Sequence, residues 1–337
     1  MSVLIVARKE FADQISSRRF LALTGIILLV TVYTVYQGVQ GFYNAYAAGM
    51  EKPFVSIFGV SSSLGFMTFG AFLGLLMGFD LVTKEKEEGS LKTLLSHPVY
   101  RDSVINGKAA GAFAALGVAI FLILAISVGI LLLYGIYPTL SDVIDVIRFG
   151  ALTLAYTFTF FAISLFASTI ARNSGTALII AFGFLILFMA VLPMLGEIAA
   201  QFIVGPPPRP PSVPPPGVSV PPQGGEAPVT DVSVSSVSTD VSVRIEEGKV
   251  PAENEEVKKL WEEYERQSRE YWERKRAVSD TFSILSPSNN YLALLSSLGA
   301  RTFFEVRDTT KNLMGFIALP VIFFIMSYIK FLRMDIT

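Results

Sequence analysis

Long stretches without any charged residue alternate with short charged segments along this chain of 337 residues. A helix needs roughly 20 apolar residues to cross the hydrocarbon core of a bilayer. The uncharged stretches cover residues 20–50, 53–79, 109–141, 149–171, 173–196 and 312–329. They are apolar on all faces, whereas the strands of a membrane barrel are short and alternating. The pattern therefore predicts six transmembrane helices, at approximately 20–36, 56–80, 109–136, 149–170, 176–196 and 313–329.

The distribution of Lys and Arg between the loops predicts the orientation of these helices, because cytoplasmic loops are enriched in both. With a cytoplasmic N-terminus, the short outer loops hold only Lys52 and Arg148. The inner segments then hold Arg8, Lys9, Arg18, Arg19, Lys84, Lys86, Lys92, Arg101, Lys108, Arg172, Lys330 and Arg333. The predicted fold is an all-α polytopic membrane protein of six transmembrane helices with both termini cytoplasmic.

The segments outside the spans predict three regions of the chain. Residues 1–204 form the transmembrane domain through span five, 205–281 an extracytoplasmic insert, and 282–337 the return segment with span six. Residues 1–19 place Leu4, Ala7, Phe11 and Ile15 on one stripe among basic residues, which is typical of an amphipathic helix at the inner membrane surface.

The insert begins with a proline-rich spacer, since ten of the 18 residues in 205–222 are proline. Residues 229–246 alternate valine with polar residues, which fits either one or two weak strands or a disordered segment. A charged helix is expected at 252–278, where acidic residues come first and basic residues last. A turn at 285–291 and a short apolar helix at 291–298, near the outer interface, should lead back to the membrane.

The cytoplasmic loop 81–108 is the main charged segment between the spans. Leu91, Leu94 and Leu95 lie at i, i+3 and i+4, which is one apolar stripe of a short helix. Pro98 breaks that helix, and a second helix is expected to begin near Arg101 and run into the third span. The loop therefore predicts a helix, a break and a second helix.

Candidate catalytic and metal chemistry is sparse. Neither Gly-Lys pair, at 107–108 or 248–249, has the upstream glycine and following hydroxyl residue of a phosphate-binding loop. The chain has no cysteine and only one histidine, His97, so no metal site or cofactor is expected. The net charge of −1 gives no reason to expect nucleic acid as a partner. Asp80, the only ionisable residue within a span, is expected to be solvated at its inner end and to pair with Lys84.

One face of the second span carries Gly70, Gly74 and Gly78 at intervals of four residues. Small residues at this spacing allow close approach between membrane helices. The sequence leaves two uses open: packing within the subunit, or a seam between two subunits.

The 81–108 loop resembles the loop that follows the second span in permeases of the type-2 ATP-binding-cassette (ABC) family. The shared order is an acidic residue in a charged run, Gly-Ser-Leu, two leucines, a proline, an arginine and Gly-Lys. Here these are Glu85 to Glu88, Gly89 to Leu91, Leu94 with Leu95, Pro98, Arg101 and Gly107-Lys108. The lead-in Arg8-Lys9-Glu10-Phe11 and Ser17-Arg18-Arg19-Phe20 is also similar to that family.

The resemblance implies a permease subunit of an ATP-driven exporter, without an ATPase site of its own, in the plasma membrane. The 81–108 loop would dock on a separate ATPase subunit, which implies buried contacts for Leu91, Leu94 and Leu95. Glu85, Glu88 and Arg101 would make charged contacts at the rim, with Gly89 and Pro98 shaping the loop. A second permease subunit, identical or a sister chain, would complete the pathway. The substrate is not indicated, since copper-related and drug- or lipid-exporting branches share these features.

The alternative interpretation is a membrane-anchored scaffold or receptor-like protein, whose extracytoplasmic helix binds a partner and which transports nothing. An apolar stripe on a cytoplasmic loop favours the permease, since a scaffold has no need for one.

Overall fold

The computed structural model describes residues 3–46, 65–89, 100–213, 232–234, 241–243, 255–297 and 309–334. The chain divides into two compact units. The membrane unit is Met1–Met194 together with Phe282–Thr337, and the insert unit is Leu195–Thr281.

The described residues include six helices that are long and apolar enough to cross a membrane, so this part of the prediction is confirmed. They are α2 (Arg18–Tyr46), η1 with α4 (Phe66–Gly70, Ala71–Gly78), α7 (Arg101–Leu133), α8 (Leu140–Ile170), α9 with η2 and α10 (Ser174–Ile186, Leu187–Val191, Leu192–Val204), and α13 (Thr309–Leu332). α7 begins at Arg101 and continues into the third span, as the loop pattern predicted. Most helices extend beyond the uncharged stretches because charged side chains at their ends still reach water.

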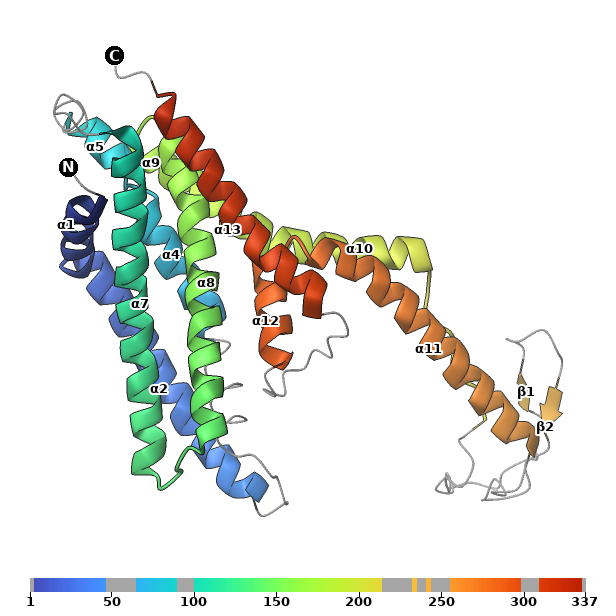
Figure 1. Ribbon diagram of the computed structural model, residues 1–337. Coiled ribbons are helices and arrows are strands. Elements are labelled where there is room, and N and C mark those ends of the chain that lie inside the picture. Colours follow the sequence, from blue (N-terminus) through green and yellow to red (C-terminus); the bar gives the residue numbers. More distant parts are fainter. Residues whose placement is uncertain are drawn as a thin grey trace. The chain divides into compact units, whose positions relative to one another are not determined.

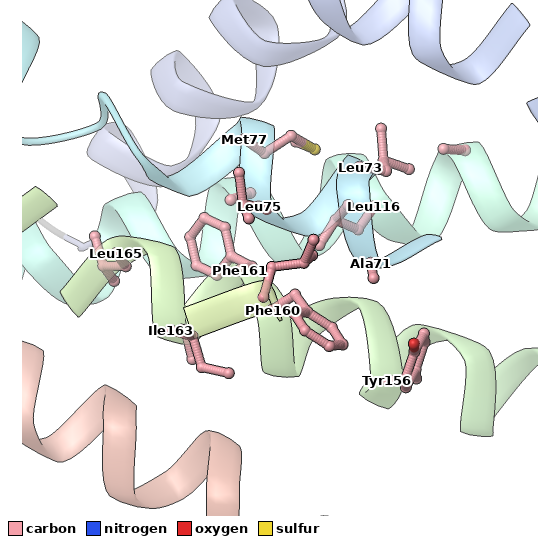
Figure 2. Packing of buried hydrophobic residues seen from close by; sticks show 14 of the residues in the cluster. Ala71, Leu73, Leu75, Met77, Leu116, Tyr156, Phe160, Phe161, Ile163 and Leu165 are labelled. Atoms are coloured by element: carbon pink, nitrogen blue, oxygen red, sulfur yellow. The ribbon is translucent and has the colours of Figure 1, made fainter. Parts of the chain in front are cut away.

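α8 is the central helix of the membrane unit, in contact with α4, α7, α9 and α13. α4 lies unusually close to it: a Cβ at Gly74 would fall 2.1 Å from the Thr157 carbonyl oxygen, and one at Gly78 the same distance from Ser164 Oγ. The glycine face of the second span is therefore used within the subunit. Leu73 and Leu75 of α4 belong to the same buried apolar cluster as Phe160 and Phe161 of α8, part of which Figure 2 shows.

Both ends of the described chain lie at the same end of the membrane unit (Figure 1). α1 (Val3–Ile15) packs along the first turns of α7, and the last turn of α13 receives hydrogen bonds from Arg101. Ala7, Phe11 and Ile15 of the predicted stripe are partly buried, whereas its first residue, Leu4, is 78% exposed. The shared end agrees with an even number of crossings.

A short helix, α12 (Pro287–Ser297), packs between α8 and α13. The predicted turn at 285–291 and interfacial helix at 291–298 are therefore wrong in register and in burial: the helix begins at Pro287, and Tyr291 is fully buried. Its polar residues find partners inside the protein. The hydroxyls of Tyr291 and Thr153 are 2.8 Å apart, and Ser286 donates to the carbonyl of Phe188.

The two π-helical segments, η1 and η2, supply carbonyls to this polar network. Met67, in η1, accepts a hydrogen bond from the hydroxyl of Tyr156, and Phe188 lies in η2. Because the π pitch shifts backbone pairing within a helix, side chains from neighbouring helices are well placed to satisfy its carbonyls. Polar residues therefore pack within the membrane unit at little cost.

The insert unit is built on α11 (Glu255–Ser283), which confirms a charged helix close to the predicted range. Trp261 Nε1 donates to the carbonyl of Val213, and the Tyr271 hydroxyl donates to that of Gly205, so residues 205–213 lie along α11. Glu197 accepts a hydrogen bond from Lys275, and this raises the lysine pKa above its ordinary value. β1 (Val232–Val234) and β2 (Val241–Val243) pair antiparallel, an arrangement that corresponds to the two-strand alternative for 229–246.

Candidate functional site: the stems of the 81–108 loop

The two ends of the 81–108 loop are joined by a buried ion pair. The first stem contains α5 (Thr83–Glu87), and the second is the start of α7. Glu85 on α5 accepts from Lys108 on α7 at 2.8 Å, and the lysine side chain is only 5% exposed. Because a lone buried ammonium is costly to desolvate, this contact specifies how the stems meet.

A third helix, α1, contributes the second carboxylate. Lys108 Nζ also donates to Glu10 at 3.1 Å, so one ammonium lies between two carboxylates from helices on either side of it. Gln14, one turn further along α1, donates both to Glu10 and to the Met77 carbonyl of α4. The loop stems and α1 are therefore linked as one charged cluster, Glu10–Lys108–Glu85.

Small residues on α7 make this approach possible. A Cβ at Gly107 would lie 2.6 Å from Val6 Cβ, and one at Gly111 would lie 2.6 Å from the Ala7 carbonyl oxygen. Only glycine allows the α1 backbone to come this close. The Gly107-Lys108 pair therefore has a structural explanation here: glycine admits α1, and the next residue binds its glutamate.

The remaining described site residues occupy separate positions. Arg101 Nη1 donates to the carbonyls of Leu332 and Met334, at 3.0 and 2.9 Å, at the C-terminal end of α13. These carbonyls have no partner within the helix, and a cation there also matches the helix dipole. Glu88 is exposed at the end of α5. Gly89 has a φ of +70°, a conformation that glycine adopts without strain.

The apolar members of the predicted site, Leu91, Leu94, Leu95 and Pro98, lie outside the described residues. Of the charged members, Glu85 lies in the buried cluster and Arg101 at α13, so only Glu88 is left fully exposed among them. Sequence reasoning did not identify Glu10 as a partner of the loop. The residue is 98 positions away from Lys108, and no local pattern marks such a pair.

Asp80 corrects a further expectation. Its partner is Arg19 at the start of α2, not Lys84, and the Arg19 guanidinium also lies 5.2 Å from the centre of the Phe79 ring. Since the arginine side chain is 61% exposed, this is a surface contact at the same end of the membrane unit. Within the part of the chain that the structure describes, no three His, Cys, Asp or Glu residues are placed to hold a metal.

Six apolar helices, each long enough to cross a bilayer, define a multi-pass membrane protein. The sequence matches the family described as "ABC-2 family transporter protein" over residues 4–336, and the chain belongs to this family. It is an ABC transporter permease subunit of the plasma membrane, which supersedes the scaffold interpretation. Family membership also implies an ATPase subunit as partner.

Two relatives carry the name "Probable ABC transporter permease protein NosY". The protein from Pseudomonas aeruginosa is 31% identical over 212 residues, which cover 57% of this chain and 70% of that protein. The protein from Stutzerimonas stutzeri is 29% identical over 119 residues, or 35% of this chain and 41% of that protein.

Proposed function

We propose that this chain forms the membrane pathway of an ATP-driven exporter and takes its energy from a separate ATPase that docks on the 81–108 loop. The observation that carries this proposal is the Glu10–Lys108–Glu85 cluster. A loop can transmit force only when its ends are fixed to the helices that must move. Here the first stem is bound to the second through Glu85 and Lys108. The second stem is bound to α1 through Lys108 and to the end of α13 through Arg101.

Leu91, Leu94 and Leu95 are the proposed buried contacts with the ATPase, and Glu88 is the proposed charged contact at the rim. Gly89 would start the loop in a conformation open to glycine, and Pro98 would end its helix. Glu85 and Arg101 would act from within, by holding the stems. Docking of an ATPase on the 81–108 loop requires this loop to be cytoplasmic. The N- and C-termini would then also be cytoplasmic and the insert unit extracytoplasmic, in agreement with the distribution of basic residues between the short loops.

A second permease subunit, identical or a sister chain, is part of the proposal. One set of six helices offers little lateral surface for a closed pathway. Since Gly74 and Gly78 contact α8 within the subunit, the seam between subunits would use other faces.

Co-purification of the chain with the ATPase encoded beside it tests the docking. We expect the wild-type pair to remain associated in detergent and the Leu94→Asp variant to lose the ATPase while still inserting into the membrane. Leu140→Asp is the matched control, because Leu140 is 80% exposed and is the first residue of α8, at the end of that helix opposite to the 81–108 loop. If Leu94→Asp retains both the ATPase and ATP-dependent export, the loop is not the docking site.

A further inference from the structure

α5 has a second set of contacts, with the turn between α8 and α9. Lys86 Nζ donates to the carbonyl oxygens of Thr169 and Ala171, at 3.2 and 3.3 Å. These residues are at the C-terminal end of α8, where carbonyls lack helical partners and the helix dipole is negative. An ammonium group is therefore well matched to this position.

The next residue binds the adjacent helix end with the opposite charge. Glu87 accepts two hydrogen bonds from Ser174, from its backbone N–H at 2.9 Å and its hydroxyl at 2.6 Å. Ser174 is the first residue of α9, and the N-terminal end of a helix is positive. Lys86 and Glu87 thus match the end of one helix and the start of the next; exchanging their charges would make both contacts repulsive.

The start of α5 is held by α8 as well. Ser168 Oγ accepts from the backbone N–H groups of Val82 and Thr83, at 3.0 and 3.1 Å. Ser168 and Thr83 are fully buried. The start and the end of α5 are therefore both held by the end of α8 and the α8–α9 turn, in addition to the ion pair between Glu85 and Lys108.

We infer that Lys86 and Glu87 are positioning residues that couple movement of the 81–108 loop to the α8–α9 turn, and through it to the fifth span. The inference rests on the proposed function, since the loop must be the part that the ATPase moves. Three of the four charged residues of α5 bind different partners. Glu85 binds Lys108 of α7, which also binds Glu10 of α1, while Lys86 and Glu87 bind the turn that begins α9, so a force on the loop reaches both groups of helices.

A spin label at Arg172 tests whether the clamp exists, without any ATPase. Arg172 is exposed in the turn, and the chain has no cysteine, so Arg172→Cys gives a single labelling site. In nanodiscs, we expect Glu87→Gln to shorten the rotational correlation time of the label about twofold. A charge-exchanged variant, Lys86→Glu with Glu87→Lys, should shorten it further. Glu88→Gln, the exposed neighbour, should leave it unchanged.

A fluorophore at the end of α9 tests transmission in the complex with the ATPase. Ile186 is 55% exposed, and bimane attached to Ile186→Cys should change its emission when ATP is trapped by vanadate. We expect Glu87→Gln to reduce this change at least fivefold while the ATPase stays bound, and Lys84→Gln, at an exposed residue of α5, to retain it.

The outcomes separate this inference from the proposed function. An unchanged label at position 172 in Glu87→Gln would overturn the clamp. A mobile label with a full ATP-dependent signal at position 186 would overturn transmission through it. If the wild-type chain neither binds the ATPase nor responds to ATP, the proposed function fails and transmission fails with it, while the correlation times still decide whether the clamp exists.

Discussion

Glu85 and Lys108, on the two stems of the 81–108 loop, form an ion pair in which the carboxylate and ammonium are 2.8 Å apart. The lysine is almost entirely buried, and its second carboxylate partner comes from α1. A buried ion pair adds little net stability over apolar packing, but the loss of one partner is costly because the other charge stays behind. The pair therefore serves to specify which segments meet at the base of the loop.

Removing the ammonium should destabilise the membrane unit strongly. Lys108→Met leaves Glu10 and Glu85 facing one another without a cation, and we expect it to cost about 3–5 kcal/mol. Adding Glu85→Gln should recover part of that loss, because one of the two carboxylates is then neutral. Unfolding in SDS, followed by circular dichroism, measures both. Strictly additive effects in the double variant would show that the two residues are not coupled.

The ion pair between Arg19 and Asp80 should behave differently, although it lies at the same end of the unit. The arginine side chain is 61% exposed, so water already solvates much of its charge. We expect Asp80→Asn to change the free energy of unfolding by less than about 1 kcal/mol in the same SDS titration. A loss as large as that of Lys108→Met would mean that exposure of the Arg19 side chain does not weaken this ion pair.

Gly74 sets the distance between α4 and α8. An alanine Cβ there would lie 2.1 Å from a backbone oxygen, which cannot move aside, so the two helices must separate. We expect Gly74→Ala to cost about 1–3 kcal/mol or more. Gly117→Ala is the control: a Cβ at this α7 position meets nothing within 4 Å, and alanine favours the helix by up to about 1 kcal/mol. Equal effects of the two substitutions would contradict this packing.

The sequence allows the six spans to be predicted because each needs only length and the absence of charge, both of which are local properties. The start of α7 at Arg101 follows from the break at Pro98 in the same way. The Glu10–Lys108–Glu85 cluster cannot be predicted from such local properties. Glu10 and Lys108 come together because Gly107 and Gly111 admit α1, and only the folded arrangement shows which helix fills that space.

α12 shows the same limit for a segment that was predicted near the membrane surface and is buried in the structure. The segment Ser286 to Asn290, at the start of this helix, consists of Ser and Asn with one Pro, and the sequence therefore predicted a turn there. In the structure Ser286 donates to the Phe188 carbonyl and the Asn290 amide nitrogen to that of Ile284, so both donors have partners inside the unit, while Asn290 Oδ1 is buried without one. The partner of Ser286 lies 98 positions away, and no pattern within 282–298 identifies it.

Arg101 should stabilise the end of α13 rather than the loop alone. Its guanidinium donates to two carbonyls of the last turn, and Arg101→Gln shortens the side chain and removes the charge. We expect amide hydrogen exchange in residues 329–334 to accelerate about fivefold to tenfold, which corresponds to roughly 1–1.5 kcal/mol. Arg333→Gln is a suitable control because it removes a charge from the same turn. Similar acceleration by both variants would mean that charge, not the Arg101 hydrogen bonds, protects the helix end.

Trp261 should hold residues 205–213 against α11 within the insert unit. Its indole N–H donates to the Val213 carbonyl at 3.1 Å, and the Val213 side chain is buried. Trp261→Phe keeps an aromatic ring but removes the donor, so we expect a loss of about 1 kcal/mol and roughly fivefold faster exchange of the α11 amides around position 261. Trp272→Phe is the matched control: its ring is 45% exposed and contacts Lys275, so exchange at 261 should be unchanged. Exchange in α8 should not respond to either variant, because α8 belongs to the other compact unit. Faster exchange in α8 with Trp261→Phe would show that the two units do not unfold separately.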